Sequence, residues 1–111
     1  MNILSKLETI INEYGPTQMA IEDLFYFKNQ KTVISVAQAR GVIMLVGRMK
    51  GLETFGYTPL QIKSAVTGYG KADKKQVQFM VQKILGLKEV PKLDDITDAM
   101  AAAICHLNST I

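Results

Sequence analysis

The chain contains only two short segments with the character of β-strands, and this scarcity constrains the fold more than any other feature. Residues 18–22 form a brief apolar run behind the Gly15-Pro16 turn, which is typical of a buried strand. β-Branched and aromatic residues give residues 52–57 the same character. Helical segments surround both strands, so the pattern predicts an α/β domain with a parallel sheet. A lone parallel pair is poorly stabilised, and we infer that something that should lie beside these strands is missing.

Apolar residues recur at helical spacing through the rest of the chain. Gly51 and Gly86 fall where two of these patterns stop, as glycines do at helix ends. The spacing predicts helices over residues 7–14, from Thr32 to the Gly51 stop, over 59–66, over 76–85, and from Asp94 or Asp95 to Leu107. A chain of 111 residues is long enough for one core, so residues 1–111 are expected to form a single domain.

The charge balance is mildly basic, with a formal net charge of +3 and a pI near 9.0. This balance permits nucleic-acid binding without requiring it, because the chain has no dense basic tract. The lysines are nevertheless bunched in one span, which holds Lys63, Lys71, Lys74, Lys75 and Lys83.

Cys105 is the only cysteine, so no intrachain disulfide can form and a reducing compartment is expected. The most hydrophobic run, residues 41–46, is too short to cross a bilayer, and no signal-peptide pattern follows Met1. These features predict a cytoplasmic protein without a membrane partner. We interpret Cys105 as a packed thiol and His106 as a residue that complements the dipole at a helix C-terminus.

Acidic, aromatic and basic residues follow one another where the first strand ends. Glu22 and Asp23 close the strand, three aromatics from Phe25 follow, and Lys28 and Lys31 come next. Strand-end acids can hold a metal, aromatic rings stack on bases, and lysines meet phosphates. This order is typical of an enzyme that acts on nucleic acid. The alternative is a strand that runs on into the core with alternate rings buried.

Asp95 and Asp98 lie three residues apart in the first turn of the last helix, so both carboxylates project to one face. One interpretation is that they complement the helix dipole, with Asp94 or Asp95 as the N-cap. The other is that they bind Mg²⁺ together with Glu22 through oxygen ligands. Two such ions about 4 Å apart would clamp an in-line phosphodiester hydrolysis.

Two further segments each allow two interpretations. The turn at residues 67–71 lacks the Gly-Lys-Ser/Thr ending of a Walker loop. Lys71, Lys74 and Lys75 are therefore either a solvated helix face or, beside a metal site, phosphate contacts that position DNA. The long helix is apolar almost all round at residues 42–46, which favours either a subunit interface or a central core helix.

Five motifs occur in order along the chain: AIEDLFYFKN at 20–29, SVAQARG at 35–41, YTPLQIK at 57–63, TGYGKADKK at 67–75 and DDITDA at 94–99. Together they closely resemble the bacterial RuvC family of Holliday junction resolvases, from about Leu7 to Ser109. The resemblance implies a ribonuclease-H-like fold and a homodimer that binds a four-way DNA junction. It also implies symmetric nicking of two strands in recombination and repair, with Mg²⁺ or Mn²⁺ as cofactor and a branch-migration motor complex as a further partner.

The resemblance also suggests roles for individual residues. The catalytic, metal-binding carboxylates of the family correspond to Glu22, Asp95 and Asp98, and Asp94 is the less close match. Phe25 resembles the aromatic that inserts at the junction crossover. The expected DNA-binding lysines are Lys63 and Lys74, which match basic residues that contact the phosphate backbone, together with Lys28, Lys31, Lys71 and Lys75. The segment from Val36 to Val46 resembles the helix through which two subunits pair.

The sequence departs from the family pattern in one respect. The family begins with a strand carrying Gly-Ile-Asp-Pro-Gly, whose Asp lies in the metal site, and two more strands follow. Met1 precedes what would be the first helix of the family, so the resemblance implies an N-terminally truncated domain with a reduced parallel sheet flanked by helices. We expect this chain alone to have lost most nicking activity. We also expect its bare sheet edge to pair with another chain.

The leading interpretation is therefore an impaired fragment of a junction-resolving endonuclease. The alternative is a non-catalytic module that binds junction DNA or only dimerises. Metal-dependent nicking separates an enzyme from a binding module. A steep salt dependence separates DNA binding from dimerisation alone, because phosphate contacts release counterions.

Overall fold

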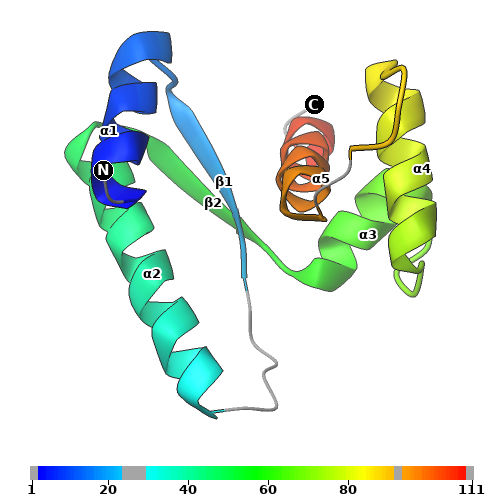
Figure 1. Cartoon of the computed structure of the whole chain (residues 1–111), viewed down its shortest axis with the longest axis horizontal. Helices are drawn as coiled ribbons and strands as arrows, with labels where there is room; N and C mark the ends of the chain where they lie inside the picture. The colour runs from blue at the N-terminus through cyan, green and yellow to red at the C-terminus, as the bar shows by residue number, and fades with distance from the viewer. Residues whose placement is uncertain (1–2, 24–29, 92–93, 110–111) are drawn as a thin grey trace. The chain divides into compact units, whose positions relative to one another are not determined.

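The computed structural model describes residues 3–23, 30–91 and 94–109. Figure 1 shows their elements, which in chain order are α1 (Ile3–Tyr14), β1 (Gln18–Glu22), α2 (Gln30–Met49), β2 (Glu53–Tyr57), α3 (Pro59–Thr67), α4 (Lys74–Leu85) and α5 (Asp94–Ser109). The α/β class and each predicted strand and helix are confirmed, with shifts of a few residues at some ends. None of the helices in the described residues combines the length and the apolar character needed to cross a membrane.

β1 and β2 pair in a two-stranded sheet. The backbone N–H of Glu53 donates to Thr17 O at 3.1 Å, and the backbone N–H of Asp23 donates to Tyr57 O at 2.7 Å. Because the partners advance in the same direction along both strands, the pair is parallel. The reduced sheet predicted from the sequence is therefore confirmed over the residues that the structure describes, and Glu22 lies at its carboxyl end.

Capping boxes fix the starts of α3 and α4. Asp73 Oδ1 accepts the backbone N–H of Gln76 at 2.8 Å, and Gln76 Oε1 accepts the backbone N–H of Asp73 at 2.8 Å. These bonds satisfy two free donors at the helix start, so α4 begins at Lys74, two residues before the predicted start. Lys74 and Lys75 therefore belong to the first turn of α4.

The described residues form two compact units. In the first, which contains residues 3–19 and 30–55, α1 packs against α2 around Ile11, Val46 and Leu52. Val46 is 3% exposed, whereas Leu45 is 59% exposed. Of the two interpretations of this helix, a central core helix therefore does not fit the single chain, and the subunit interface stays a prediction.

The second unit contains residues 20–23, 56–91 and 94–109. In it α3 packs against α4 and α5, and α4 packs against α5 (Figure 1). Their shared core consists of Ile62, Val66, Ala72, Val77, Val81, Ala101, Ala102, Ile104 and Cys105. Cys105 is 2% exposed, which confirms the packed thiol, and burial raises its pKa.

His106 links α5 to the end of β2. The residue is 7% exposed, and a hydrogen bond of 2.6 Å joins its Nδ1 to the Tyr57 hydroxyl. His106 does lie in the last turn of α5, where a dipole role was expected. Its tyrosine partner could not be predicted from local patterns, because the two residues are 49 positions apart.

Candidate functional site

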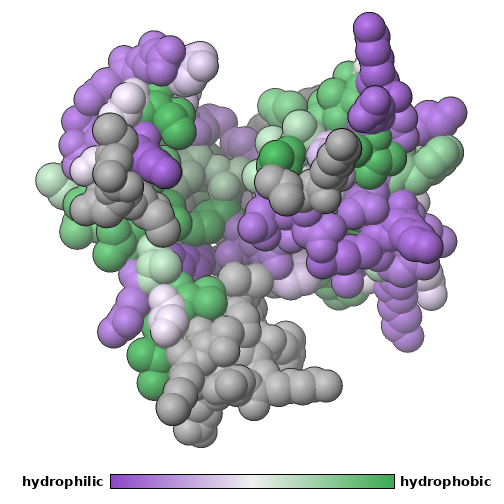
Figure 2. Space-filling view, viewed as in Figure 1, coloured by the Kyte–Doolittle hydropathy of each residue, from purple (hydrophilic) through white to green (hydrophobic). Residues whose placement is uncertain are grey.

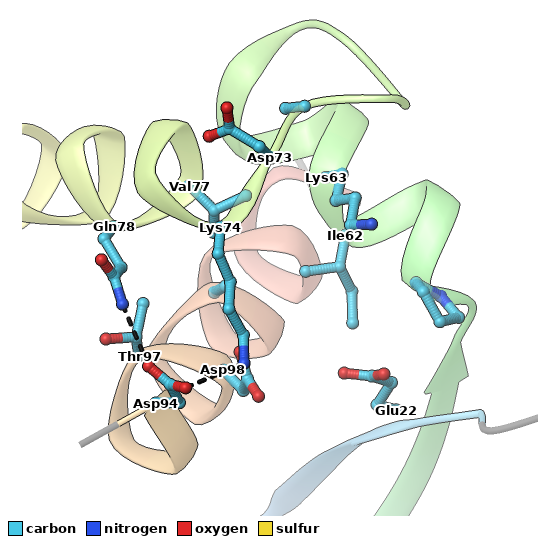
Figure 3. Close-up of a pocket in the computed structure, with 13 residues that line it drawn as sticks. Glu22, Ile62, Lys63, Asp73, Lys74, Val77, Gln78, Asp94, Thr97 and Asp98 are labelled. Atoms are coloured by element: carbon cyan, nitrogen blue, oxygen red, sulfur yellow. Dashed lines mark hydrogen bonds and ion pairs between the residues drawn. The ribbon is translucent and has the colours of Figure 1, made fainter.

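A cavity of about 260 Å³ lies in the second unit, where β1 ends. Core side chains, among them Ile62, Val77 and Ala101, form its apolar part. Its polar lining, all labelled in Figure 3, consists of Glu22, Lys63, Asp73, Lys74, Gln78, Asp94, Thr97 and Asp98. The cavity thus brings four carboxylates and two ammonium groups together beside an apolar surface.

Four different elements carry these charged groups. Glu22 ends β1, Lys63 lies in α3, and Lys74 opens α4. Asp94 and Asp98 are four residues apart on α5 and therefore share one face of that helix. Figure 3 shows Lys74 extending from α4 toward the start of α5, while Glu22 comes from the strand. The site depends on the packing of the whole second unit.

Burial and like charges raise the pKa of two carboxyl groups. The pKa of Glu22 lies above its ordinary value of 4.5, chiefly because burial disfavours the anion; Asp98 raises it further and Lys63 lowers it. Partial burial also raises the pKa of Asp98 above 3.8, Lys74 opposes this rise, and the other acids of α5 add to it. Two carboxylates held in this way are chemically suited to a divalent cation, which would remove their repulsion.

Asp94 binds two side chains of α4. Lys74 Nζ lies 2.8 Å from Asp94 Oδ2, and Gln78 Nε2 donates to Asp94 Oδ1 at 3.1 Å (dashed lines in Figure 3). The hydrogen bond to Asp94 raises the pKa of Lys74, so the ammonium stays charged at neutral pH. The Lys74 and Asp94 side chains are 65% and 52% exposed, and such pairs add little to stability. The main effect of Asp94 is to hold the Lys74 ammonium group beside the cavity.

Thr97 is a cavity residue that the sequence interpretation missed. It is 2% exposed, and its Oγ1 has no hydrogen-bond partner in the part of the chain that the structure describes. A buried hydroxyl without a partner costs about 1–3 kcal/mol, and this one lies in the cavity lining. Only its place inside the DDITDA motif at 94–99 could have pointed to it, because threonine is otherwise ordinary in a helix.

Replacing Thr97 with Val is expected to raise the free energy of unfolding by about 1 kcal/mol, because the isosteric methyl removes an unpaired buried hydroxyl. Urea unfolding would measure the change. Thr67 provides the matched control, since its hydroxyl donates to Lys63 O at 2.8 Å and accepts from the Tyr69 N–H at 3.0 Å. Thr67→Val should lower stability. If both changes lower stability, the Thr97 hydroxyl cannot be unpaired in the folded chain.

The Glu22→Gln variant is expected to be more stable than the wild type at neutral pH without metal, and the gain should shrink on acidification. The folded chain binds the Glu22 proton more tightly than the unfolded chain, since the folded pKa is raised above 4.5. Wild-type stability therefore increases as the pH falls through the folded pKa. The gain should stay below about 1 kcal/mol, because the side chain is partly exposed. Urea unfolding with EDTA, from about pH 8 to about pH 4, tests this; a gain that does not change with pH would contradict it.

Two of the three predicted metal carboxylates, Glu22 and Asp98, line the cavity. Asp95 is exposed and does not line it, because it lies about 100° around the helix from Asp94. Within the described ranges, no group of three or more Asp, Glu, His or Cys side chains is arranged to hold a metal ion. The oxygen donors suit Mg²⁺ chemically, and the complete ligand set remains a prediction.

The predicted DNA-binding residues fall into three groups. Lys63 and Lys74 line the cavity, whereas Lys71 and Lys75 are exposed elsewhere on the same unit. Figure 2 shows hydrophilic residues gathered over α3 and the start of α4 on the visible face. Lys31 falls within α2, while Phe25 and Lys28 lie outside the described residues.

Residues 1–106 match the family model described as crossover junction endodeoxyribonuclease RuvC. The RuvC of Fusobacterium nucleatum is 60% identical over 107 residues, which cover 96% of this chain and 56% of the relative. The RuvC of Syntrophomonas wolfei is 55% identical over 107 residues, which cover 96% of this chain and 62% of the relative. The chain thus spans a little more than half the length of these relatives.

A solved structure shares the fold of this chain. Thermus thermophilus RuvC in complex with a Holliday junction substrate superposes with a TM-score of 0.92 at 30% identity, covering 97% of this chain and 66% of that chain. The fold, with acids at the end of β1 and at the start of α5, defines a ribonuclease-H-like α/β domain. The match to the family model and the high sequence identity then identify the family within this fold class. The chain belongs to the RuvC family of crossover junction endodeoxyribonucleases.

Proposed function

We propose that this chain is the junction-binding and carboxylate-bearing part of a Holliday junction resolvase, an endonuclease that uses Mg²⁺ or Mn²⁺ to nick four-way DNA junctions symmetrically. The observation that carries the proposal is the cavity, where burial and like charge make a cation favourable at Glu22 and Asp98, beside Lys63 and Lys74. Family membership and the junction-bound Thermus relative support the same function.

The charged side chains that meet in the cavity have complementary roles in this reaction. Glu22 and Asp98 would hold the metal, which when bound would activate water and polarise the phosphate; Asp95, predicted as a third ligand from the family resemblance, lies outside the cavity lining. Lys63 and Lys74 neutralise backbone phosphates and fix the strand in the cavity, without reading its sequence. Asp94 keeps the Lys74 ammonium near the carboxylates until a phosphate replaces it.

Binding to a labelled four-way junction in EDTA tests the DNA part of this proposal. The chain should bind the junction better than a linear duplex, and its affinity should fall steeply with salt. Lys63→Ala and Lys74→Ala should each reduce the slope of log K against log salt by about 0.9. Lys6→Ala, an exposed change on α1, is the matched control. Salt-insensitive binding, or equal effects of all three changes, would contradict the proposal.

A second candidate, a module that binds junctions without cutting them, is favoured by one observation. In the part of the chain that the structure describes, no three acidic, histidine or cysteine side chains form a metal-binding group. A chain of this kind would bind the junction equally well with and without Mg²⁺ and would leave both strands intact. The two candidates share the lysine contacts and differ only in metal dependence.

The exposed face of α2 supports the homodimer that the family resemblance implies. Ile34, Val42, Leu45 and Met49 share this face and are each at least 44% exposed. A stripe of this kind suits a second copy of the same helix. Leu45→Glu is therefore expected to convert a dimer into a monomer in sedimentation velocity. Identical sedimentation of the variant and the wild type would exclude this helix as the interface.

A further inference from the structure

A second hollow, of about 410 Å³, lies on the same unit as the candidate site and shares Ala72 and Asp73 with its lining. Its other walls include Tyr69, Lys75, Phe79 and Met80. Its volume is within the range of roughly 300–1,000 Å³ that small-molecule sites occupy. The segment before α4 therefore borders two hollows, of which only the first contains the carboxylates of Glu22 and Asp98.

Two aromatic rings are exposed in this second hollow. Tyr69 is 56% exposed and Phe79 is 52% exposed. Single exposed apolar side chains are ordinary in proteins, but two large rings that line one hollow form a patch suited to a ligand. Flat rings next to basic side chains are the combination that holds unpaired nucleotides, because every base has a face that can stack.

The charge around the rings is mainly positive. Lys75 lines the hollow, Lys71 is exposed two positions from Tyr69, and Lys83 Nζ lies 5.3 Å from the centre of the Phe79 ring. Asp73 also lines the hollow, but its Oδ1 accepts the backbone N–H of Gln76 at 2.8 Å. The hollow therefore suits an anionic ligand with a flat, apolar part.

We propose that this hollow is a nucleotide-stacking subsite in which an unstacked DNA base lies against Tyr69 and Phe79 while Lys71 and Lys75 contact its flanking phosphates. The proposal rests on the proposed DNA-binding function and extends it. Lys74 and Lys75 are consecutive, and each lines a different hollow. Because the two hollows are adjacent, a strand held at Lys74 would pass beside the second hollow, which places the subsite next to the proposed position of cutting.

Fluorescence of a short single-stranded oligodeoxynucleotide with a central 2-aminopurine tests the subsite, in EDTA at low salt. Stacking on the rings should quench the probe as the wild-type chain binds. Tyr69→Ala and Phe79→Ala should each weaken binding about 10-fold, and Tyr69→Phe should restore it because the ring remains. Tyr14, which is 74% exposed on α1, supplies the matched control, and Tyr14→Ala should bind like the wild type.

The outcomes separate the subsite from the proposed function. A wild-type chain that does not quench the probe, or ring variants that bind it like the wild type, would overturn the subsite even if the chain binds four-way junctions. Quenching that is lost in both ring variants would establish the subsite even if the chain shows no preference for junctions over linear duplexes. In that case the resolvase proposal would fail and the subsite would stand.

Discussion

Replacing Glu22 with Gln is expected to reduce Mg²⁺-dependent nicking of a four-way junction at least about 100-fold while leaving junction binding nearly unchanged. Glu22 lies in the cavity with Asp98, where burial and like charge already raise its pKa. Gln keeps the size and hydrogen-bonding capacity of the side chain but removes the negative charge that a hard cation requires. The loss should therefore appear in the cutting rate and not in affinity.

The experiment requires a protein that cuts at a measurable rate. A suitable form is a fusion that adds the part of the Fusobacterium nucleatum relative that the match does not cover. Glu13→Gln, an exposed change on α1, controls for the loss of a negative charge in general. Equal nicking by the Glu22→Gln variant and the wild-type fusion would remove Glu22 from the catalytic group. Loss of binding together with nicking would indicate a structural role instead.

Replacing Ile104 with Ala is expected to lower the free energy of unfolding by about 2–5 kcal/mol. Ile104 is 5% exposed on α5 and belongs to the core that joins α3, α4 and α5. Removing most of its side chain leaves a cavity that the surrounding helices fill only in part. The loss is large compared with the roughly 5–15 kcal/mol that stabilises a typical domain. The candidate site between these helices should therefore also be less stable.

Leu107 provides the control on the same helix. It is 62% exposed, so Leu107→Ala should change stability by no more than about 0.5 kcal/mol. Urea unfolding followed by circular dichroism would measure both variants. Similar losses for the two changes would mean that α5 does not pack through Ile104. If Ile104→Ala also disrupts the candidate site, the variant should bind junctions more weakly at a urea concentration where the wild type remains folded.

The sequence predicted most of the fold because its signals are local. Gly15-Pro16 and Gly51 mark the ends of helical patterns, and the scarcity of strands predicted the two-stranded sheet that the structure contains. The start of α4 was missed because the capping box of Asp73 and Gln76 was not recognised. Along α2 the apolar pattern left a subunit interface and a core helix open, because such a pattern cannot by itself distinguish an interface from a core; its exposed side chains are not those of a core helix in the single chain.

The site was predictable only in part. The acids Glu22 and Asp98 were identified from the sequence, and the structure brings them to one cavity. The bond from Lys74 to Asp94, 20 positions apart, and the unpaired hydroxyl of Thr97 depend on how α4 packs against α5. Hydrogen bonds of this kind follow from tertiary contacts, which motif spacing does not encode.

The central claim is tested most directly by a nicking assay on a labelled synthetic four-way junction in Mg²⁺. The assay compares this chain, the fusion described above, and the Fusobacterium nucleatum relative as a positive control. We predict paired, symmetric nicks with the fusion, and much less cutting by the chain alone. Intact junctions with the fusion, under conditions in which the relative cuts, would contradict the assignment of Glu22 and Asp98 to a working nuclease site.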